Sequence, residues 1–439
     1  MTRFTVLLML LVPLAASAQR VDVQEYHLAN GMKILLVENH TVPSICYFSY
    51  FKVGSRNETL GITGISHLFE HMMFNGSKKY KPGQLDQIIE RGGGYSNAST
   101  WNDFTNYFEE FNPDLLDTVL DIEADRMRAL KLDSANIEQE RGIVKEERRV
   151  STDNDVRNAA TEVLYANAFV AHPYQHQVIG WMADLDNIRL DDAKAYFRTY
   201  YAPNNAVVIL TGDFNSAKAI ALIRKHFESI PAQAPPRENL NAEPEQHGEK
   251  RIKFYKAAEL PAVLIGYKSI SARDSDYAAA DMLGQILSRG QSSRLYRRLV
   301  YDKQMCTQVW GGADELRDPG LFTFYAQMKE GFRTEDAERE IYAILDSIKQ
   351  NGVRPEELQK ARNNAQADYV RRFKTNEGTG FILGYYETLS GDYHRALTVV
   401  QQYERVTNDQ IKRLAARLFD EQRRTVVTLI PQAPDAGTN

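Results

Sequence analysis

Cysteines and long apolar runs are scarce in this sequence. Its 439 residues contain only two cysteines, Cys46 and Cys306, which lie in different halves of the chain. A chain of this size can build its cores without disulfides, so we interpret both as buried apolar residues; a disulfide formed after export is the alternative. After the N-terminal segment no apolar run is long enough to cross a bilayer, and we predict no membrane span.

An excess of basic residues is also lacking. Lys and Arg together number 53 against 58 Asp and Glu, which gives a formal net charge of −5. This balance argues against a partner that is a nucleic acid or an anionic membrane surface. The chain does contain 43% hydrophobic residues, a composition typical of globular proteins with sizeable cores.

The N-terminal segment has the composition of a secretory signal. Arg3 gives it a positive start, residues 6–14 are apolar, and Ala16-Ser17-Ala18 forms a small-x-small cleavage site. The apolar run is too short for a retained membrane anchor. We therefore predict a signal peptide over residues 1–18, cleaved after Ala18, and a periplasmic location for the mature protein.

The rest of the chain divides at residues 231–249, which are rich in Pro, Glu, Gln and Asn and poor in apolar residues. Both sides follow the same order of alternating strands, a helix, and finally a helix with a β-branched strand. We predict an α+β fold of two homologous units, each a mostly antiparallel sheet with helices packed on one face. The predicted divisions are an N-terminal domain at 19–232, a linker at 233–249, a C-terminal domain at 250–431 and a flexible tail at 432–439.

A helix expected over residues 61–74 carries the order H-x-x-E-H at His67, Glu70 and His71. Residues four apart lie one turn above each other, so both imidazoles can reach one ion, and zinc accepts such ligands. Glu70 borders the same face and can hydrogen-bond a metal-bound water, as in the inverted zinc motif of this order. The same spacing also arises by chance on ordinary polar helix faces, so a third ligand is needed to support a metal site.

A second helix, expected over residues 134–150, offers that third ligand. One of its stripes mixes two apolar residues with two carboxylates: Glu140, Ile143, Val144 and Glu147. Apolar residues of a helix normally face the core, so the two glutamates are expected to be drawn inward, where they need a metal or a basic partner.

The expected positions of the other charged residues of this helix favour Glu147 over Glu146 as the metal ligand. Glu146, Arg148 and Arg149 are expected on the solvated face. We therefore predict Glu147 as the third ligand and Glu140, two turns earlier, as a carboxylate that orients a ligating histidine.

These residues resemble the pitrilysin/insulinase family of zinc peptidases. Glu140 and Glu147 are 7 residues apart, Glu147 follows His71 by 76 residues, and both spacings match the family pattern. The segments at 92–100 and 172–181 are also similar to family stretches, the first being the family's glycine turn and substrate-binding edge strand. The resemblance implies one zinc ion per chain held by His67, His71 and Glu147.

The resemblance also implies a substrate-binding strand. In the family, the residues that correspond to Asn97 and Ala98 contact the backbone of the cleaved peptide. Residues 95–108 are expected to be strand-like, and Gly92–Gly94 to let another backbone approach closely. From the residues alone, an ordinary glycine hairpin is an equal alternative.

The function implied is a zinc-dependent endopeptidase that hydrolyses extended or unfolded peptides. A zinc-activated water attacks the peptide carbonyl, and Glu70 moves its proton to the leaving amine. One alternative is a non-catalytic peptide-binding or assembly subunit, since the family contains scaffold members that have lost metal residues. Another is a metal-dependent hydrolase of a different substrate class.

One departure from the family concerns an Arg and a Tyr, seven residues apart, which active members carry at a helix-to-strand junction of the later half or of a partner. Here Val300 or Tyr301 stands at the Arg position, and Thr307 or Gln308 at the Tyr position. Arg294 and Tyr301 have the right spacing but precede the junction, so we interpret them as a coincidence. We predict a heterodimer in which a related second chain supplies the pair; a homodimer is less favoured.

Overall fold

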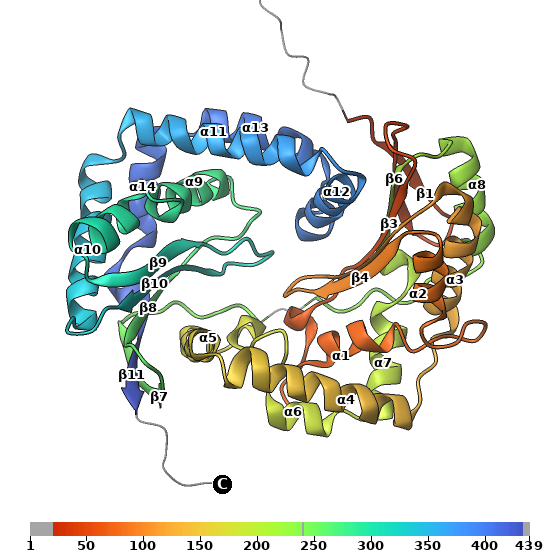
Figure 1. Ribbon diagram of the computed structural model, residues 1–439, viewed down its shortest axis with the longest axis horizontal. Helices are drawn as coiled ribbons and strands as arrows, with labels where there is room; N and C mark the ends of the chain where they lie inside the picture. Colours follow the sequence, from red (N-terminus) through yellow and green to blue (C-terminus); the bar gives the residue numbers. More distant parts are fainter. Residues whose placement is uncertain (1–20, 239–240, 433–439) are drawn as a thin grey trace, which may run out of the picture.

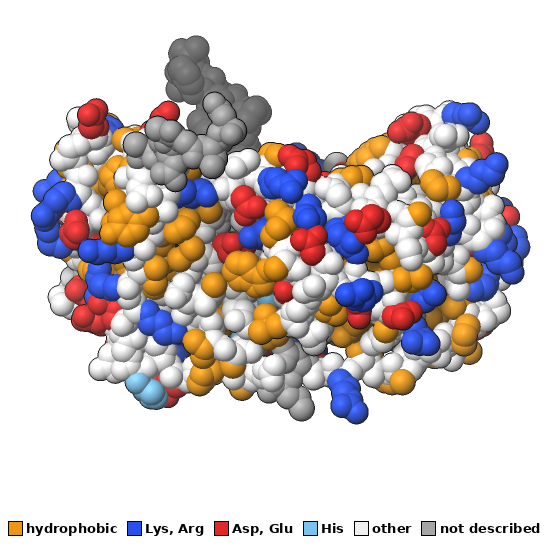
Figure 2. Space-filling view, turned by 90° about the horizontal axis from the view of Figure 1, so that it is seen from below, with side chains coloured by type: hydrophobic (Ala, Val, Ile, Leu, Met, Phe, Trp, Pro, Cys, Tyr) orange, Lys and Arg blue, Asp and Glu red, His pale blue; other side chains and the backbone are white. Residues whose placement is uncertain are grey.

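The computed structural model describes residues 21–238 and 241–432 and has two lobes, each built around one sheet (Figure 1). The predicted signal peptide lies outside the described residues, as does the predicted tail except for Gln432, the last residue of β11. Among the described residues no helix has the length and apolar character needed to cross a membrane. Positive and negative side chains are interspersed over the face in Figure 2, without a continuous patch of one sign.

The first sheet has six strands in the order β1-β2-β6-β3-β5-β4. Their bounds are Gln24–His27 (β1), Lys33–Glu38 (β2), Ile45–Phe51 (β3), Tyr95–Thr100 (β4), Thr105–Phe111 (β5) and Ala206–Gly212 (β6). The helices of this half are α1 (Ile65–Met72), α2 (Gln84–Arg91), α3 (Leu116–Ala129), α4 (Ser134–Arg148), α5 (Val156–Ala168), α6 (Met182–Asn187), α7 (Leu190–Tyr200) and α8 (Ser216–Phe227). Most of these helices share one core with one face of the sheet.

The second sheet has five strands in the order β7-β11-β8-β10-β9. Their bounds are Lys250–Ala257 (β7), Ala262–Lys268 (β8), Cys306–Ala313 (β9), Leu321–Met328 (β10) and Arg424–Gln432 (β11). The helices are α9 (Tyr277–Ser288), α10 (Thr334–Asn351), α11 (Pro355–Arg372), α12 (Asn376–Ser390), α13 (His394–Arg405) and α14 (Asn408–Leu418). The core on one face of this sheet includes residues of α9, α10 and α14.

The two sheets have the same topology. The order β7-β11-β8-β10-β9 repeats β2-β6-β3-β5-β4, and in each series the first pair is parallel and the others are antiparallel. The predicted α+β fold with two homologous, mostly antiparallel units is therefore confirmed.

Each half also covers the second face of the other half's sheet, which the sequence did not predict. Helix α5 packs on β8 and β11, and α12 packs on β3 and β6 (Figure 1). Two glycines on one side of α12 make the second contact possible. A Cβ atom at Gly380 would lie 2.6 Å from the ring of Phe48, and one at Gly384 would lie 2.1 Å from the ring of Tyr50. The two halves are interlocked because each contributes one helix, α5 or α12, to the sheet of the other.

The stretch between the halves is anchored rather than fully solvated. Its described residues form no helix or strand before β7. The Glu243 carboxylate accepts hydrogen bonds from the backbone N–H groups of residues 170–172 and lies 3.1 Å from Nζ of Lys268 in β8. One acidic side chain therefore connects the linker to both halves, because it accepts from backbone donors of one and pairs with a buried cation of the other.

Both cysteines are buried and neither forms a disulfide. Cys46 lies in β3 of the first sheet, and Cys306 lies in β9 of the second. Burial raises the pKa of the Cys306 thiol to about 12, which keeps it protonated and unreactive. The structure therefore supports the interpretation of both as apolar core residues.

Candidate metal centre

Helix α1 separates its apolar residues from its polar ones. Leu68, Phe69 and Met72 face the core, whereas His67 and His71 are only partly buried on the other side. The helix begins later than residue 61 because Gly64 adopts a φ of +88°. A Cβ atom at Gly64 would also lie 2.6 Å from the carbonyl oxygen of Ile179, so both backbone conformation and space require glycine there.

Helix α4 lies beside α1, but its buried row differs from the predicted stripe. The buried residues of α4 are Ile137, Glu140, Val144 and Arg148. Ile143, which we predicted to be buried, is 43% exposed. Arg148, which we predicted to be solvated, binds the Glu162 carboxylate and donates to the Gly180 carbonyl oxygen. A charged side chain can replace an apolar one in this row because those two groups satisfy it.

Three side chains from α1 and α4 converge. Oε2 of Glu147 lies 3.7 Å from Nε2 of His67 and 3.4 Å from Nε2 of His71, and one ligand atom of each residue falls within 4.8 Å of the others. Ligands about 2.0–2.2 Å from a tetrahedral zinc ion are themselves separated by about 3.3–3.6 Å, so the His71–Glu147 distance lies in this range and the His67–Glu147 distance just above it. The donor set of two imidazoles and one carboxylate, at these separations, fits a zinc ion. The Glu147 side chain is 44% exposed, so the site is open to solvent.

Glu140 contacts the other ring nitrogen of His71. Its Oε2 lies 3.3 Å from Nδ1 of His71, and its Oε1 accepts a hydrogen bond of 2.9 Å from the amide of Asn75. A proton on Nδ1 then faces Glu140, and the lone pair of Nε2 faces the candidate metal site. The structure thus places Glu140 where the sequence predicted an orienting carboxylate, and it adds Asn75, which the sequence analysis missed.

His67 is kept neutral by its surroundings. Burial, together with the nearby His71, lowers the pKa of His67 to about 4. Nδ1 of His67 is buried without a hydrogen-bond partner among the described residues. A neutral imidazole is the form that binds a metal ion, so the environment of His67 suits a ligand at neutral pH.

Glu70 lies on α1 next to the end of β4. Burial raises the pKa of the Glu70 carboxyl; hydrogen bonding from Thr100 and the charge of His71 oppose the shift, and Glu147 adds to it. A carboxylate with a raised pKa is a stronger base than an exposed one. Glu70 is therefore a partly buried carboxyl group between the three converging side chains and the edge of the first sheet.

Strand β4 is the outer strand of the first sheet, and its free edge can be assigned. The Ala98 N–H donates to Oδ1 of Asn97 at 2.8 Å rather than to β5. Backbone groups of alternate residues in an antiparallel strand face opposite sides. The N–H and C=O groups of Ser96, Ala98 and Thr100 therefore face the free edge, and those of Asn97 face β5.

One expectation for this region was wrong in detail. The segment expected to be one strand from 95 to 108 is a hairpin that turns at residues 101–104. A Cβ atom at Gly94 would lie 2.0 Å from the carbonyl oxygen of Glu110. Gly94 therefore allows the backbone of β5 to approach closely within the sheet.

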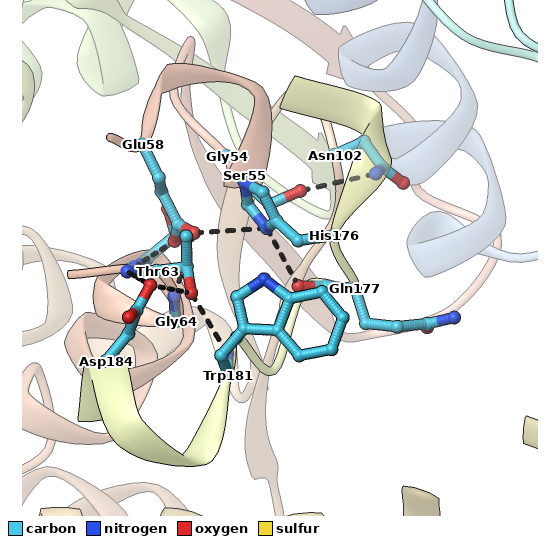
Figure 3. Close-up of polar contacts among 12 residues, drawn as sticks. Gly54, Ser55, Glu58, Thr63, Gly64, Asn102, His176, Gln177, Trp181 and Asp184 are labelled. Carbon is cyan, nitrogen blue, oxygen red and sulfur yellow. Dashed lines mark hydrogen bonds and ion pairs between the residues drawn. The ribbon is translucent and has the colours of Figure 1, made fainter. Parts of the chain in front are cut away.

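Two acids, the buried Glu58 and the partly buried Asp184, hold the start of α1 in place (Figure 3). Glu58 accepts hydrogen bonds of 2.8 Å from the N–H groups of Gly64 and Ser66. Asp184 accepts from the N–H and hydroxyl groups of Thr63, whose hydroxyl oxygen in turn accepts from the N–H of Trp181. The family-like segment that contains Trp181 therefore positions the helix that carries both histidines. The sequence analysis missed Glu58, because it lies seven residues before the first residue of α1 and outside the positions of a local capping signal.

The other family-like residues join the two halves. Nε2 of His172 lies 3.0 Å from Oδ2 of Asp318, and Nε of Arg56 lies 2.5 Å from the same oxygen. Tyr174 donates to Asp103, in the turn after β4, at 2.7 Å. Asp318 lies between β9 and β10, so the cluster connects the second sheet to the segment before α1.

Arg294 and Tyr301, the pair interpreted as a coincidence, contact other residues of the second half. Arg294 forms a bidentate hydrogen-bonded ion pair with Glu357 of α11. Tyr301 is 64% exposed and lies under the guanidinium of Arg297. Both side chains are therefore engaged or exposed within the second half.

Comparison with known proteins agrees with the geometry. The family model for insulinase (peptidase family M16) matches residues 33–180, and the model for the peptidase M16 inactive domain matches residues 187–365. The chain is 33% identical to the zinc protease PqqE of Helicobacter pylori, over 96% of this chain and 97% of that one. It is 24% identical to the uncharacterized zinc protease YmxG of Bacillus subtilis, over 91% and 96% of the two chains. A crystal structure of a protease from Helicobacter pylori superposes with a TM-score of 0.89 at 32% identity, covering 94% of this chain and all of that one.

Proposed function

Since this chain belongs to the insulinase (M16) family of peptidases, we propose that it is a zinc-dependent endopeptidase that cleaves extended or unfolded peptides. The observation that carries the proposal is the convergence of His67, His71 and Glu147 at zinc-ligand separations. The base Glu70 next to this site, and a free sheet edge beside it, supply the other two requirements of peptide hydrolysis.

In this proposal His67, His71 and Glu147 hold the ion, and Glu140 keeps His71 in the ligating orientation. When bound, zinc supplies Lewis acidity to a water molecule and to the peptide carbonyl. Glu70 takes a proton from the attacking water and delivers it to the leaving amine. The burial that raises the pKa of Glu70 suits both transfers, because the carboxyl group must accept the proton and then release it.

The peptide binds as an added strand along β4. Its backbone pairs with the outward N–H and C=O groups of Ser96 and Ala98, since the Thr100 backbone already bonds the Glu70 carboxyl group. The Asn97 side chain, which now accepts from the Ala98 N–H, must give way to a peptide carbonyl oxygen. Recognition through backbone groups requires an extended peptide and places few demands on most side chains.

We also propose that a related second chain supplies the Arg and Tyr that the family carries at the helix-to-strand junction, in a heterodimer rather than a homodimer. The proposal rests on the residues at the Arg and Tyr positions, Val300 or Tyr301 and Thr307 or Gln308. The test is to purify the chain alone and with a candidate partner and to compare turnover of the same peptide. Full activity of the isolated chain contradicts the proposal.

A periplasmic location is proposed from the signal-like residues 1–18. Sequencing the N-terminus of the protein recovered from a periplasmic fraction tests it, and a mature chain that begins at Gln19 is the expected result. Recovery of the chain with Met1 in the cytoplasm contradicts it.

A non-catalytic peptide-binding or assembly subunit is the second candidate. It is favoured by the match of residues 187–365 to the inactive-domain model. The metal-binding candidates all lie in the other half, which matches the insulinase model. A zinc-free chain without turnover is the result that would favour this candidate.

The central test is a peptidase assay with and without chelator on the wild type and on Glu70→Gln. We expect Glu70→Gln to retain zinc and to lose about 10²–10⁴-fold in turnover, the contribution of a general base. His71→Ala and Glu147→Ala are expected to lose zinc as well as activity. Undiminished turnover of Glu70→Gln contradicts the mechanism.

A further inference from the structure

A cavity of about 320 Å³ lies between the two halves at the turn that follows β4. Its size falls within the roughly 300–1,000 Å³ of ligand pockets. Residues from both halves line it, among them Trp101, Thr161, His176, Asp314, Glu315 and Tyr385. Because Trp101 lines the cavity and directly follows Thr100, the cavity lies next to the end of β4.

Two carboxyl groups in the cavity wall have no cation partner. Neither Asp314 nor Glu315 forms an ion pair within 4 Å among the described residues, and Asp314 instead accepts from the Tyr165 hydroxyl and the Leu321 N–H. Burial raises the pKa of Asp314 to about 6. Burial and the charge of Asp281 raise the pKa of Glu315 to about 7, although hydrogen bonds from Tyr385 and Tyr386 and the charge of Arg372 oppose the shift. Buried carboxylates of this kind gain most from a cation that enters the cavity.

The imidazole of His176 adds an unused acceptor to the same wall. His176 is only 2% exposed, and its Nδ1 lies 3.2 Å from the carbonyl oxygen of Gln177 (Figure 3). A carbonyl oxygen can only accept, so the ring proton is on Nδ1, and Nε2 carries a lone pair. That Nε2 is buried and has no hydrogen-bond partner among the described residues. A buried acceptor that has no donor is energetically unfavourable, so a ligand with an N–H or O–H donor would be stabilised at this nitrogen.

We propose that this cavity binds a basic side chain of the peptide substrate, with arginine preferred to lysine. A guanidinium supplies the missing positive charge and has five N–H donors in a planar fork, which can serve a carboxylate and an imidazole at once. The inference rests on the proposed function, because the peptide reaches the cavity only when it lies along β4. It adds one selective position to an otherwise backbone-based recognition.

Peptides that differ only by arginine or citrulline at one position test the proposal, because citrulline has nearly the same shape without the charge. We expect a tenfold or larger preference in kcat/KM for arginine at one position. Glu315→Gln is expected to reduce that preference to about twofold or less. Asp314→Asn is a second variant, in case one of the two fails to fold. Glu377→Gln, which removes a carboxylate at the opposite end of β4, is the matched control and should keep the preference.

Binding measured by fluorescence anisotropy on the zinc-loaded Glu70→Gln chain separates this proposal from the peptidase proposal. Preferential binding of the arginine peptide that Glu315→Gln abolishes supports the cavity even if the wild type hydrolyses nothing. Hydrolysis without an arginine preference at any position overturns the cavity proposal and leaves the peptidase proposal standing. A preference that survives both Glu315→Gln and Asp314→Asn also overturns it.

Discussion

Oε2 of Glu140 lies 3.3 Å from Nδ1 of His71, and this contact decides which ring nitrogen of His71 faces Glu147. Glu140 is buried and comes from α4, whereas His71 comes from α1. The same helix thus carries one group that can bind the ion and one that orients another ligand. The contact with Nδ1 of His71 suits Glu140 to orient this histidine, whereas His67, His71 and Glu147 are the candidates that would bind the metal ion.

Glu140→Gln is predicted to weaken zinc binding by about 10–100-fold, because the neutral amide holds and polarises His71 less well than the carboxylate. Competition with a chromogenic chelator measures the affinity. Glu146→Gln is the matched control, since Glu146 is exposed on the same helix and forms an ion pair with Arg149 at the surface. Equal zinc affinities of Glu140→Gln and Glu146→Gln would count against the orienting role.

Ala98→Pro is predicted to raise KM for peptides at least tenfold while the chain stays folded. The Ala98 N–H faces the free edge and makes no bond to β5, so its loss affects a bound peptide more than the sheet. Ala98→Ser keeps the N–H and serves as the control. Peptide kinetics and circular dichroism of both variants are the measurements. An unchanged KM in Ala98→Pro would show that the peptide binds elsewhere.

Gly384→Ala is predicted to lower the free energy of unfolding by about 1–3 kcal/mol, the usual cost of overpacking. The added methyl group would lie 2.1 Å from the ring of Tyr50, so α12 must move away from the first sheet. Gly142→Ala in α4 meets no atom within 4 Å and should stabilise the chain by about 0.5–1 kcal/mol. Denaturant unfolding of both variants checks the opposite signs. A destabilised Gly142→Ala or a neutral Gly384→Ala would contradict this packing.

Asp318→Asn is predicted to destabilise the chain near neutral pH by about 1–2 kcal/mol. Burial alone would raise the pKa of Asp318, but the hydrogen bonds from His172 and Arg56 and the charge of Arg56 hold it at about 2. A lowered folded-state pKa gives stability that is fully present above the unfolded value of 3.8 and is lost as the pH falls toward 2. Unfolding measured from pH 7 to pH 3 should therefore show the wild type and the variant converging in acid. A constant difference over that range would exclude the ion pair as its source.

The sequence by itself determined the local parts of this molecule. The four-residue spacing of His67 and His71 needs only one helical turn to bring both imidazoles to one face. The repeated order of strands and helices likewise follows from apolar periodicity within each segment, and the observed topology of both sheets agrees with it. Glu147 lies beside both histidines, and seven residues make nearly two whole helical turns from Glu140.

Only the tertiary structure decided which segments meet. Arg148 is buried because Glu162 and Gly180, which belong to other segments, bind its guanidinium. The apolar periodicity of α4 carries no information about these partners, so it assigned Ile143 to the buried row in place of Arg148. The exchange of α5 and α12 between the sheets and the cavity at Asp314 arise in the same way. Residues far apart in the chain come into contact because folded helices and strands have complementary shapes and charges. A local sequence pattern does not specify this complementarity.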